Sequence, residues 1–279
     1  MMVEFKNDMM RQYEMTDLGL PHHFLGLGFG LKDCKFVATP LAVNEKLSKV
    51  DGSELADETL YRQMVGSLLY LTATRPDIMF AASLLARFMH NPTKKHMGTT
   101  KRVLRYIQGT MNYGIAYEKG KGAVLIGYCD SDWSGSEDDM RSTSGYAFNL
   151  GSGVFSWASI KQSSVALSTA EAEYMSAAEA TAQAMWLRFV LSDLGEEQNP
   201  VHHHKTRHIN RRFHFIRDAL QDGEIDLLYC KTEEQLADIF TKPLARDRFE
   251  YLRKALGVIL AQHLEAALDH SPSVQQRMF

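Results

Sequence analysis

Three acidic residues lie near the ends of predicted strands and helices, where their side chains could bind one metal ion together. Asp130 ends a predicted strand, Glu173 lies near the start of a long predicted helix, and Asp238 lies one turn into a later one. Such ends are where α/β proteins gather functional side chains. Because Mg²⁺ prefers carboxylate oxygens, the set suggests a divalent-cation site. Taken singly, each acid also has a structural explanation, such as a turn-forming aspartate at 130.

Neighbouring acids compete for these roles. Glu171 and Glu173 are two residues apart, so their side chains point roughly 200° apart around the helix. Ser168 and Glu171 have the spacing of an N-terminal capping box, which gives Glu171 a structural role. Asp132 is an alternative to Asp130, with capping of the next turn as its structural role. Glu173 is the better candidate because it heads a stripe of mostly small residues that would pack on a sheet: Ala177, Ala180, Ala184 and Leu187.

The elements that must position these acids follow from hydrophobic periodicity. Residues 54–110 have helical spacing, and from Ala123 the period changes to two. Strands followed by helices, with a further strand and helix, predict an α/β fold. The predicted elements after residue 120 are strands at 123–130, 145–150, 153–158 and 224–230, and helices at 168–194, 206–220, 233–240 and from 245.

Composition excludes several classes of protein. The 279 residues carry 31 basic and 34 acidic side chains, a net charge of −3, so no global basic field indicates a polyanion partner. At about 150 residues per domain, the length allows about two domains. The three cysteines form no C-x-x-C pair, which excludes a cysteine zinc site and a disulfide scaffold. No signal peptide or membrane-spanning run is recognisable, so we expect a soluble intracellular protein without a membrane partner, in cytoplasm or nucleus.

Ordered motifs carry a resemblance to one family over roughly residues 5–257. The runs 127–135, 141–146, 166–174 and 233–244 (the last Glu-Glu-Gln-Leu-Ala-Asp-Ile-Phe-Thr-Lys-Pro-Leu) resemble the ribonuclease H domain of copia-type retrotransposon Pol polyproteins. The runs 61–71 and 74–78 resemble the segment that connects its reverse transcriptase to that domain, and 24–27 and 38–41 resemble the end of the reverse transcriptase.

The resemblance implies four parts: a truncated reverse transcriptase remnant (1–53), a helical connection segment (54–120), a ribonuclease H-like domain (121–257) and a C-terminal tail (258–279). The implied fold is α/β, a ribonuclease H-like mixed sheet with flanking helices. The implied activity is hydrolysis of the RNA strand of an RNA–DNA hybrid with two Mg²⁺ ions. The residues carried over are Asp130, Glu173 and Asp238 as catalytic and metal-binding acids. Because a surface that binds a hybrid needs basic and hydroxyl groups, the first candidates for the nucleic-acid contact are Arg141, Ser142, Thr143 and Ser144, with an ordinary hydrophilic loop as the alternative.

Two departures from the family pattern change the fold and the activity that the resemblance implies. Between Gln198 and Asn199 the family has a strand, a short helix and a further acid, none of which this chain contains. We therefore expect weakened metal binding and a sheet that lacks one central strand, with Glu224–Cys230 pairing directly with Ala123–Asp130. The reverse transcriptase segment is also cut short after Gly28 and lacks that enzyme's catalytic aspartates, so no polymerase activity is expected.

Three alternatives follow. The chain is a Mg²⁺-dependent hybrid-specific endoribonuclease, or a catalytically inactive Pol remnant that only binds nucleic acid, or a chain that does not fold stably because of its two gaps. The intact set of three acids favours the first, whereas the missing acid and strand favour the second.

Overall fold

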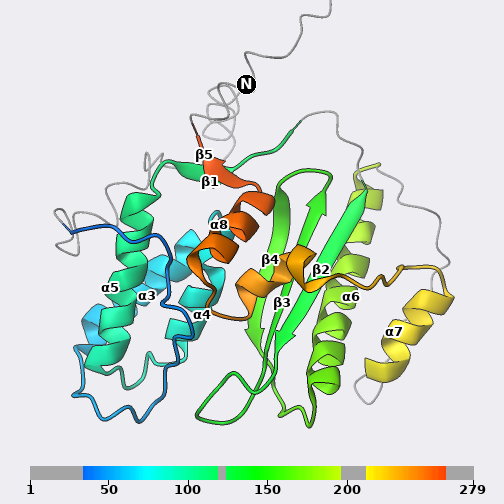
Figure 1. Cartoon of the computed structure of the whole chain (residues 1–279). Helices are drawn as coiled ribbons and strands as arrows, with labels where there is room; N and C mark the ends of the chain where they lie inside the picture. Colours follow the sequence, from blue (N-terminus) through cyan, green and yellow to red (C-terminus); the bar gives the residue numbers. More distant parts are fainter. Residues whose placement is uncertain (1–33, 119–123, 196–211, 262–279) are drawn as a thin grey trace, which may run out of the picture. The chain divides into compact units, whose positions relative to one another are not determined.

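The structure is a computed structural model that describes residues 34–118, 124–195 and 212–261. The described residues from Phe36 onward belong to one compact unit. Among them, no helix is long and apolar enough to cross a membrane. In chain order the elements are α3 (Glu58–Leu71), η1 (Pro76–Ile78), α4 (Met79–Ala86), α5 (Lys94–Gly109), β1 (Tyr113–Ile115), β2 (Leu125–Asp132), β3 (Thr143–Leu150), β4 (Val154–Lys161), α6 (Thr169–Asp193), α7 (Arg212–Gln221), η2 (Thr232–Glu234), η3 (Leu236–Phe240), α8 (Arg246–Ala255) and β5 (Val258–Leu260) (Figure 1).

A three-stranded antiparallel sheet in the order β2-β3-β4 forms the centre of the site-bearing part. Its register places Asp130 opposite Gly145 and Leu125 opposite Leu150. The β3–β4 hairpin turns at Gly151, whose φ of 80° lies in the left-handed region that glycine adopts without strain. The three strands predicted between residues 123 and 158 are confirmed, each with slightly different ends.

Helix α6 covers one face of this sheet. Its N-cap is Ser168, whose hydroxyl accepts a hydrogen bond from the Glu171 backbone N–H at 3.2 Å. The Glu171 carboxylate accepts from the Leu167 N–H, one residue before the position of a regular capping box. The predicted small-residue stripe does face the sheet, where Ala180, Ala184 and Leu187 pack against Phe148 and its neighbours.

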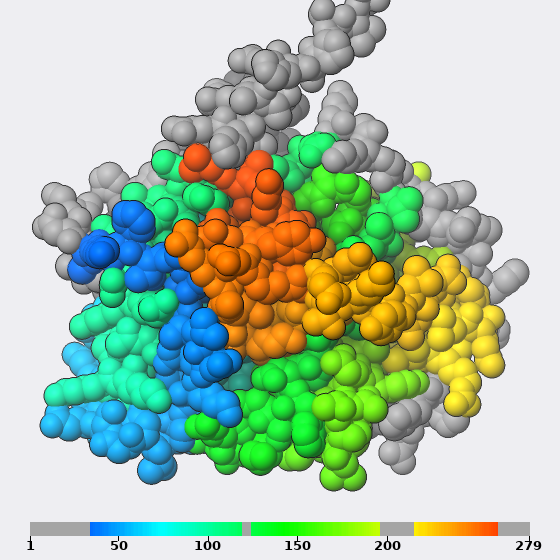
Figure 2. Space-filling view, viewed as in Figure 1, coloured from blue at the N-terminus to red at the C-terminus, as the bar shows by residue number. Residues whose placement is uncertain are grey.

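On the opposite face, η3 packs against β2 and β3. Figure 2 shows the orange segment that contains η3 and α8 lying over the strands. Close contact is possible because β3 has no side chain at Gly145. A Cβ there would lie 2.7 Å from Phe240 Cβ and 2.8 Å from Thr241 Cγ2. Phe240 is fully buried in this contact layer. The glycine therefore sets how near Asp238, on the same short helix, comes to the sheet.

The helices α3, α4 and α5 pack together beside the sheet. Thr93 caps α5 with a capping box that uses the side chain of His96. Hydrogen bonds join this helical part to the sheet, from Ser83 Oγ to the Ser159 carbonyl and from Trp157 Nε1 to the Thr72 carbonyl. The segments expected as 54–120 and 121–257 are thus in direct contact within one unit.

Several sequence predictions are wrong. Glu224–Cys230 forms no strand and does not pair with β2, so the described sheet is antiparallel and not mixed. The segment is largely exposed, with Leu228 84% and Tyr229 90% accessible. The helix expected at 233–240 is two short 3₁₀ helices separated by Gln235. The C-terminal tail was expected to begin at residue 258. In the structure β5 pairs with β1, so the fold continues to Leu260.

A buried ionic network links the helical part to α8. Arg75 donates to both carboxylate oxygens of Asp77 at 2.8 and 2.7 Å, and Tyr106 Oη donates to the same carboxylate at 2.6 Å. Arg75 also donates to the carbonyl and hydroxyl of Thr110, while Arg253 of α8 donates to Tyr106 Oη. Arg75 and Asp77 are only 5% and 2% exposed. Burial acts to raise the pKa of Asp77, but Arg75 outweighs it and holds that pKa below its ordinary value.

Asp77→Asn is therefore expected to lower the free energy of unfolding by roughly 3–5 kcal/mol, because it leaves the Arg75 guanidinium buried without a counter-charge. Chemical denaturation monitored by circular dichroism measures the loss. Asp226→Asn, at an exposed position, serves as the control and should change stability by less than about 0.5 kcal/mol. Equal stability of the two variants would contradict this role of Asp77.

Candidate active site

Asp130 lies near the end of β2, on the face that carries η3. Because strand side chains alternate, Cys129 faces α6 while Asp130 faces the opposite side. Asp130 is 8% exposed, and Thr241 Oγ1, at the end of η3, donates to its Oδ2. A buried carboxylate is costly unless it is paired, so the position of η3 is tied to the end of β2.

Asp238 approaches from η3 and is 4% exposed. Arg248 of α8 donates to Asp238 Oδ2 at 3.0 Å. The same guanidinium also donates to the carbonyl groups of Thr232, Glu233 and Gln235. Arg248 therefore holds both the carboxylate and the backbone turn that leads into η3.

Lys242 joins the two buried aspartates. Its Nζ lies 2.7 Å from Asp238 Oδ1 and 3.5 Å from Asp130 Oδ2. Burial acts to lower the pKa of Lys242, but the two carboxylates outweigh it and the pKa lies above its ordinary value. A full positive charge therefore sits between two of the three predicted acids.

Glu173 reaches the same place from α6. The residue as a whole is exposed, yet burial of its carboxyl group, together with the charge of Asp130, raises its pKa from 4.5 to about 7. The Ser131 backbone N–H donates to this carboxylate, and Lys242 and Asp238 are near enough to affect it. The structure thus brings Asp130, Glu173 and Asp238 together at one end of the sheet.

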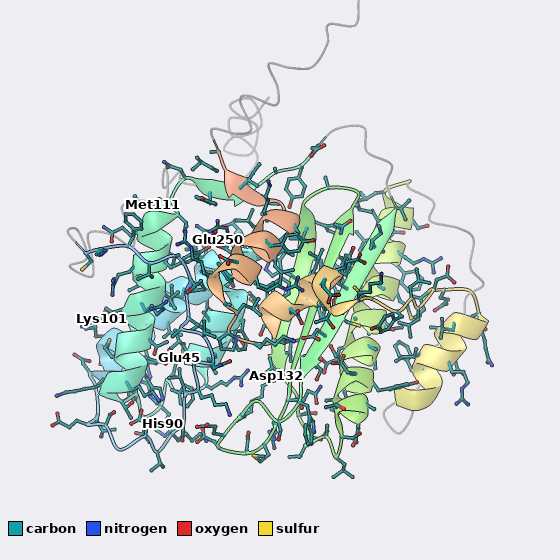
Figure 3. The ribbon with its side chains drawn as sticks, in the orientation of Figure 1. Glu45, His90, Lys101, Met111, Asp132 and Glu250 are labelled. Atoms are coloured by element: carbon teal, nitrogen blue, oxygen red, sulfur yellow. The ribbon has the colours of Figure 1, made fainter. Side chains whose placement is uncertain are left out.

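Asp132, the alternative to Asp130, is the last residue of β2 (Figure 3). Because strand side chains alternate, it faces the same side of the sheet as Asp130. Its carboxylate folds over the following turn. A Cβ at Gly135 would lie only 1.9 Å from Asp132 Oδ2. Burial, with the charge of Asp130, raises the pKa of Asp132. The Asp132 carboxyl group therefore lies against the turn at Gly135, beside the site, where the charges of Lys242 and Asp130 also act on it.

The residues chosen for nucleic-acid contact are divided by the structure. Ser142, Thr143 and Ser144 are at most 2% exposed, and their hydroxyl oxygens accept hydrogen bonds from Ser134 N–H, Arg87 and Gln162 respectively. The Arg141 side chain is 42% exposed, and its Nε lies 3.7 Å from Asp139 Oδ2. Of the four residues, only Arg141 remains accessible to a ligand.

The donor set fits a divalent cation in its chemistry, because three carboxyl groups provide the oxygen ligands that Mg²⁺ prefers. In the described ranges, however, no group of three or more His, Cys, Asp or Glu side chains is close enough to hold a metal ion. The Lys242 ammonium stands between Asp130 and Asp238 and supplies a cationic charge there. A divalent cation at this position requires the lysine to move.

The sequence analysis missed the residues that orient these acids. Lys242 is four residues after Asp238, a spacing that favours an ion pair on a helix. This spacing would have indicated the contact between the two side chains. Gln235 lies before η3, and its Nε2 donates to the Cys129 carbonyl on β2 at 2.9 Å. No local pattern indicates the contact of Gln235 with Cys129, which lies 106 residues away, or that of Arg248 with Asp238, which lies on a different element.

Comparison with known proteins shows similarity to long transposon proteins. The chain is 42% identical over 242 residues to the retrovirus-related Pol polyprotein from transposon RE1 of Arabidopsis thaliana, covering 80% of this chain and 16% of the relative. It is 41% identical over 243 residues to that from transposon RE2 of the same plant, covering 81% and 17%. It is 33% identical over 306 positions to that from transposon TNT 1-94 of Nicotiana tabacum, covering 92% and 23%.

The chain therefore spans less than a quarter of the length of these relatives. The TNT 1-94 alignment is longer than the 279 residues of the chain, so that relative contains residues without a counterpart here. No protein-family model and no solved structure matches the chain.

The raised pKa of Glu173 leads to a pH-dependent stability. Because the folded chain holds this proton more tightly than the unfolded chain, stability falls as the pH rises from about 4.5 to about 7 and then levels off. Glu173→Gln removes this loss, so its melting temperature relative to the wild type should rise across that range. Thermal melts in EDTA measure it, with Glu137→Gln in the β2–β3 loop as the control. A constant difference between Glu173→Gln and wild type across the range would disprove the assignment.

Proposed function

Since the chain is homologous to retrovirus-related Pol polyproteins from transposons, we propose that it is a retrotransposon-derived ribonuclease H-like protein that hydrolyses the RNA strand of RNA–DNA hybrids. In this proposal the chain corresponds to a C-terminal part of a copia-type Pol polyprotein, with the end of the reverse transcriptase and the connection segment before the ribonuclease H-like domain. The catalytic and metal-binding residues are Asp130, Glu173 and Asp238.

The observation that carries the proposal is the convergence of three acids from separate elements at one end of the sheet. Asp130 comes from β2, Glu173 from α6 and Asp238 from η3, and Asp130 and Asp238 both contact Lys242. The acids are 43 and 65 residues apart along the chain, so local structure alone does not explain their meeting. Acidic side chains gathered in this way, one of which (Glu173) has a raised pKa, are typical of functional sites.

The residues around the acids hold them in fixed positions for this chemistry. A bound divalent cation would supply an activated water as nucleophile and stabilise the leaving 3′ oxygen. Thr241 orients Asp130, Arg248 orients Asp238, and the Ser131 N–H orients Glu173. With a pKa of about 7, Glu173 can hold or release a proton at neutral pH. The accessible Arg141 is the proposed contact to a backbone phosphate.

A second candidate function is binding of nucleic acid without cleavage. It is favoured by Lys242, which already neutralises Asp130 and Asp238, and by the family's further acid, which has no counterpart in this sequence. In this case the chain would bind hybrids through Arg141 and other basic groups, and its affinity would fall steeply with salt concentration.

Cleavage of a labelled RNA–DNA hybrid, with double-stranded RNA and double-stranded DNA as comparison substrates, tests the proposal. We expect RNA-strand cleavage of the hybrid alone in Mg²⁺ or Mn²⁺, abolished by EDTA. Asp130→Asn and Glu173→Gln should each reduce the rate by on the order of 100-fold or more, because they remove a direct ligand. Glu137→Gln should leave the rate unchanged. Cleavage that persists in Glu173→Gln would contradict the site, and salt-dependent binding without cleavage by any variant would establish the second function.

A further inference from the structure

The position of Lys242 goes beyond an ordinary ion pair. Its Nζ lies within 2.7 Å of Asp238 Oδ1 and 3.5 Å of Asp130 Oδ2, and these carboxylates belong to residues that are 4% and 8% exposed. Two negative charges at such burial are strongly unfavourable without a cation. The lysine therefore provides the neutralisation that a divalent cation would provide in the loaded site.

We propose that Lys242 is a built-in occupant of the metal site, which binds Asp130 and Asp238 in the metal-free chain and must leave before a divalent cation can enter. The inference rests on the proposed function, because it concerns the same carboxylates, and it adds the regulation of their metal affinity. An ammonium and a divalent cation cannot share the space between the two carboxylates, since like charges a few ångströms apart repel. Lys242 therefore lowers the affinity of the site for metal ions.

The two cations beside Asp238 differ in their freedom to move. Arg248 is held by the carbonyl groups of Thr232, Glu233 and Gln235 in addition to Asp238. Lys242 has a side chain that is 38% exposed, and its ion pairs are to the two carboxylates alone among the described residues. A lysine side chain is flexible and its ammonium is strongly hydrated, so it can turn to solvent. Arg248 stays as the fixed support of Asp238, and Lys242 is the group that exchanges with metal.

Titration of the full chain with Mn²⁺, followed by calorimetry, tests this assignment. Lys242→Met should bind Mn²⁺ about tenfold more tightly than the wild type, because the competing charge is gone. The same variant should melt at a lower temperature than the wild type without metal. Saturating Mn²⁺ should raise its melting temperature by more than it raises that of the wild type. Lys242→Arg keeps the charge and should bind Mn²⁺ with an affinity within about threefold of the wild type. Lys101→Met, at an exposed position on α5, is the charge-matched control and should bind as the wild type does.

The outcomes separate this inference from the proposed function. Tighter binding in Lys242→Met that Asp238→Asn abolishes in the same background would support both. If the wild type binds Mn²⁺ through Asp238 and Lys242→Met binds no more tightly, the inference fails and the proposed metal site stands. If neither chain binds Mn²⁺, the metal site and the inference both fail. A purely structural role of Lys242 predicts weaker binding in the methionine variant, which would also overturn the inference.

A measurement on the unaltered chain covers the case in which Lys242→Met does not fold. Acetylation by an N-hydroxysuccinimide ester, quantified by mass spectrometry, reports how accessible the Lys242 amine is. Mn²⁺ should raise the labelling rate of Lys242 several-fold while leaving that of Lys101 unchanged. An acetylation rate of Lys242 that Mn²⁺ leaves unchanged or lowers would overturn the proposal that metal displaces this lysine.

Discussion

Neutralisation of the buried carboxylates at the end of β2 is the constraint on which the site depends. Asp130 and Asp238 come from elements that are distant in sequence, and each is less than 10% exposed. Lys242 and Arg248 supply two cations, and Thr241 adds a hydroxyl donor. Because an unpaired charge at this depth is strongly destabilising, these contacts fix η3 against the sheet. The close approach of η3 is possible only because position 145 has no side chain.

The edge of β2 that faces away from β3 is a second feature of the site. Among the described residues no strand pairs with that edge, so its backbone groups need other partners. Gln235 donates to the Cys129 carbonyl and the Ser131 N–H donates to Glu173. Side chains thus take the place of a neighbouring strand along the half of β2 that carries the site. The other half, around Ile126 and Gly127, is exposed.

Helix α8 couples the site to the helical part of the unit. Arg248 contacts Asp238, and Arg253 reaches Tyr106, which in turn donates to the buried Asp77. The two arginines are five residues apart on one short helix, so a shift of α8 would disturb both ionic groups. The helical part therefore supports the geometry of the acids, although it contributes none of the three.

Local patterns in the sequence determined the elements and the identity of the candidate acids. The period-two strands, the cap at Ser168 and the Ala180–Leu187 contact with the sheet all follow from nearest-neighbour sterics and burial, and the structure confirms them. The unpaired state of Glu224–Cys230 was decided only by tertiary structure, since β propensity does not specify a partner. The burial of Ser142–Ser144 and the placement of Lys242 between two aspartates were decided in the same way. Burial and charge pairing depend on residues far apart in the chain, and no local pattern encodes which of them will meet.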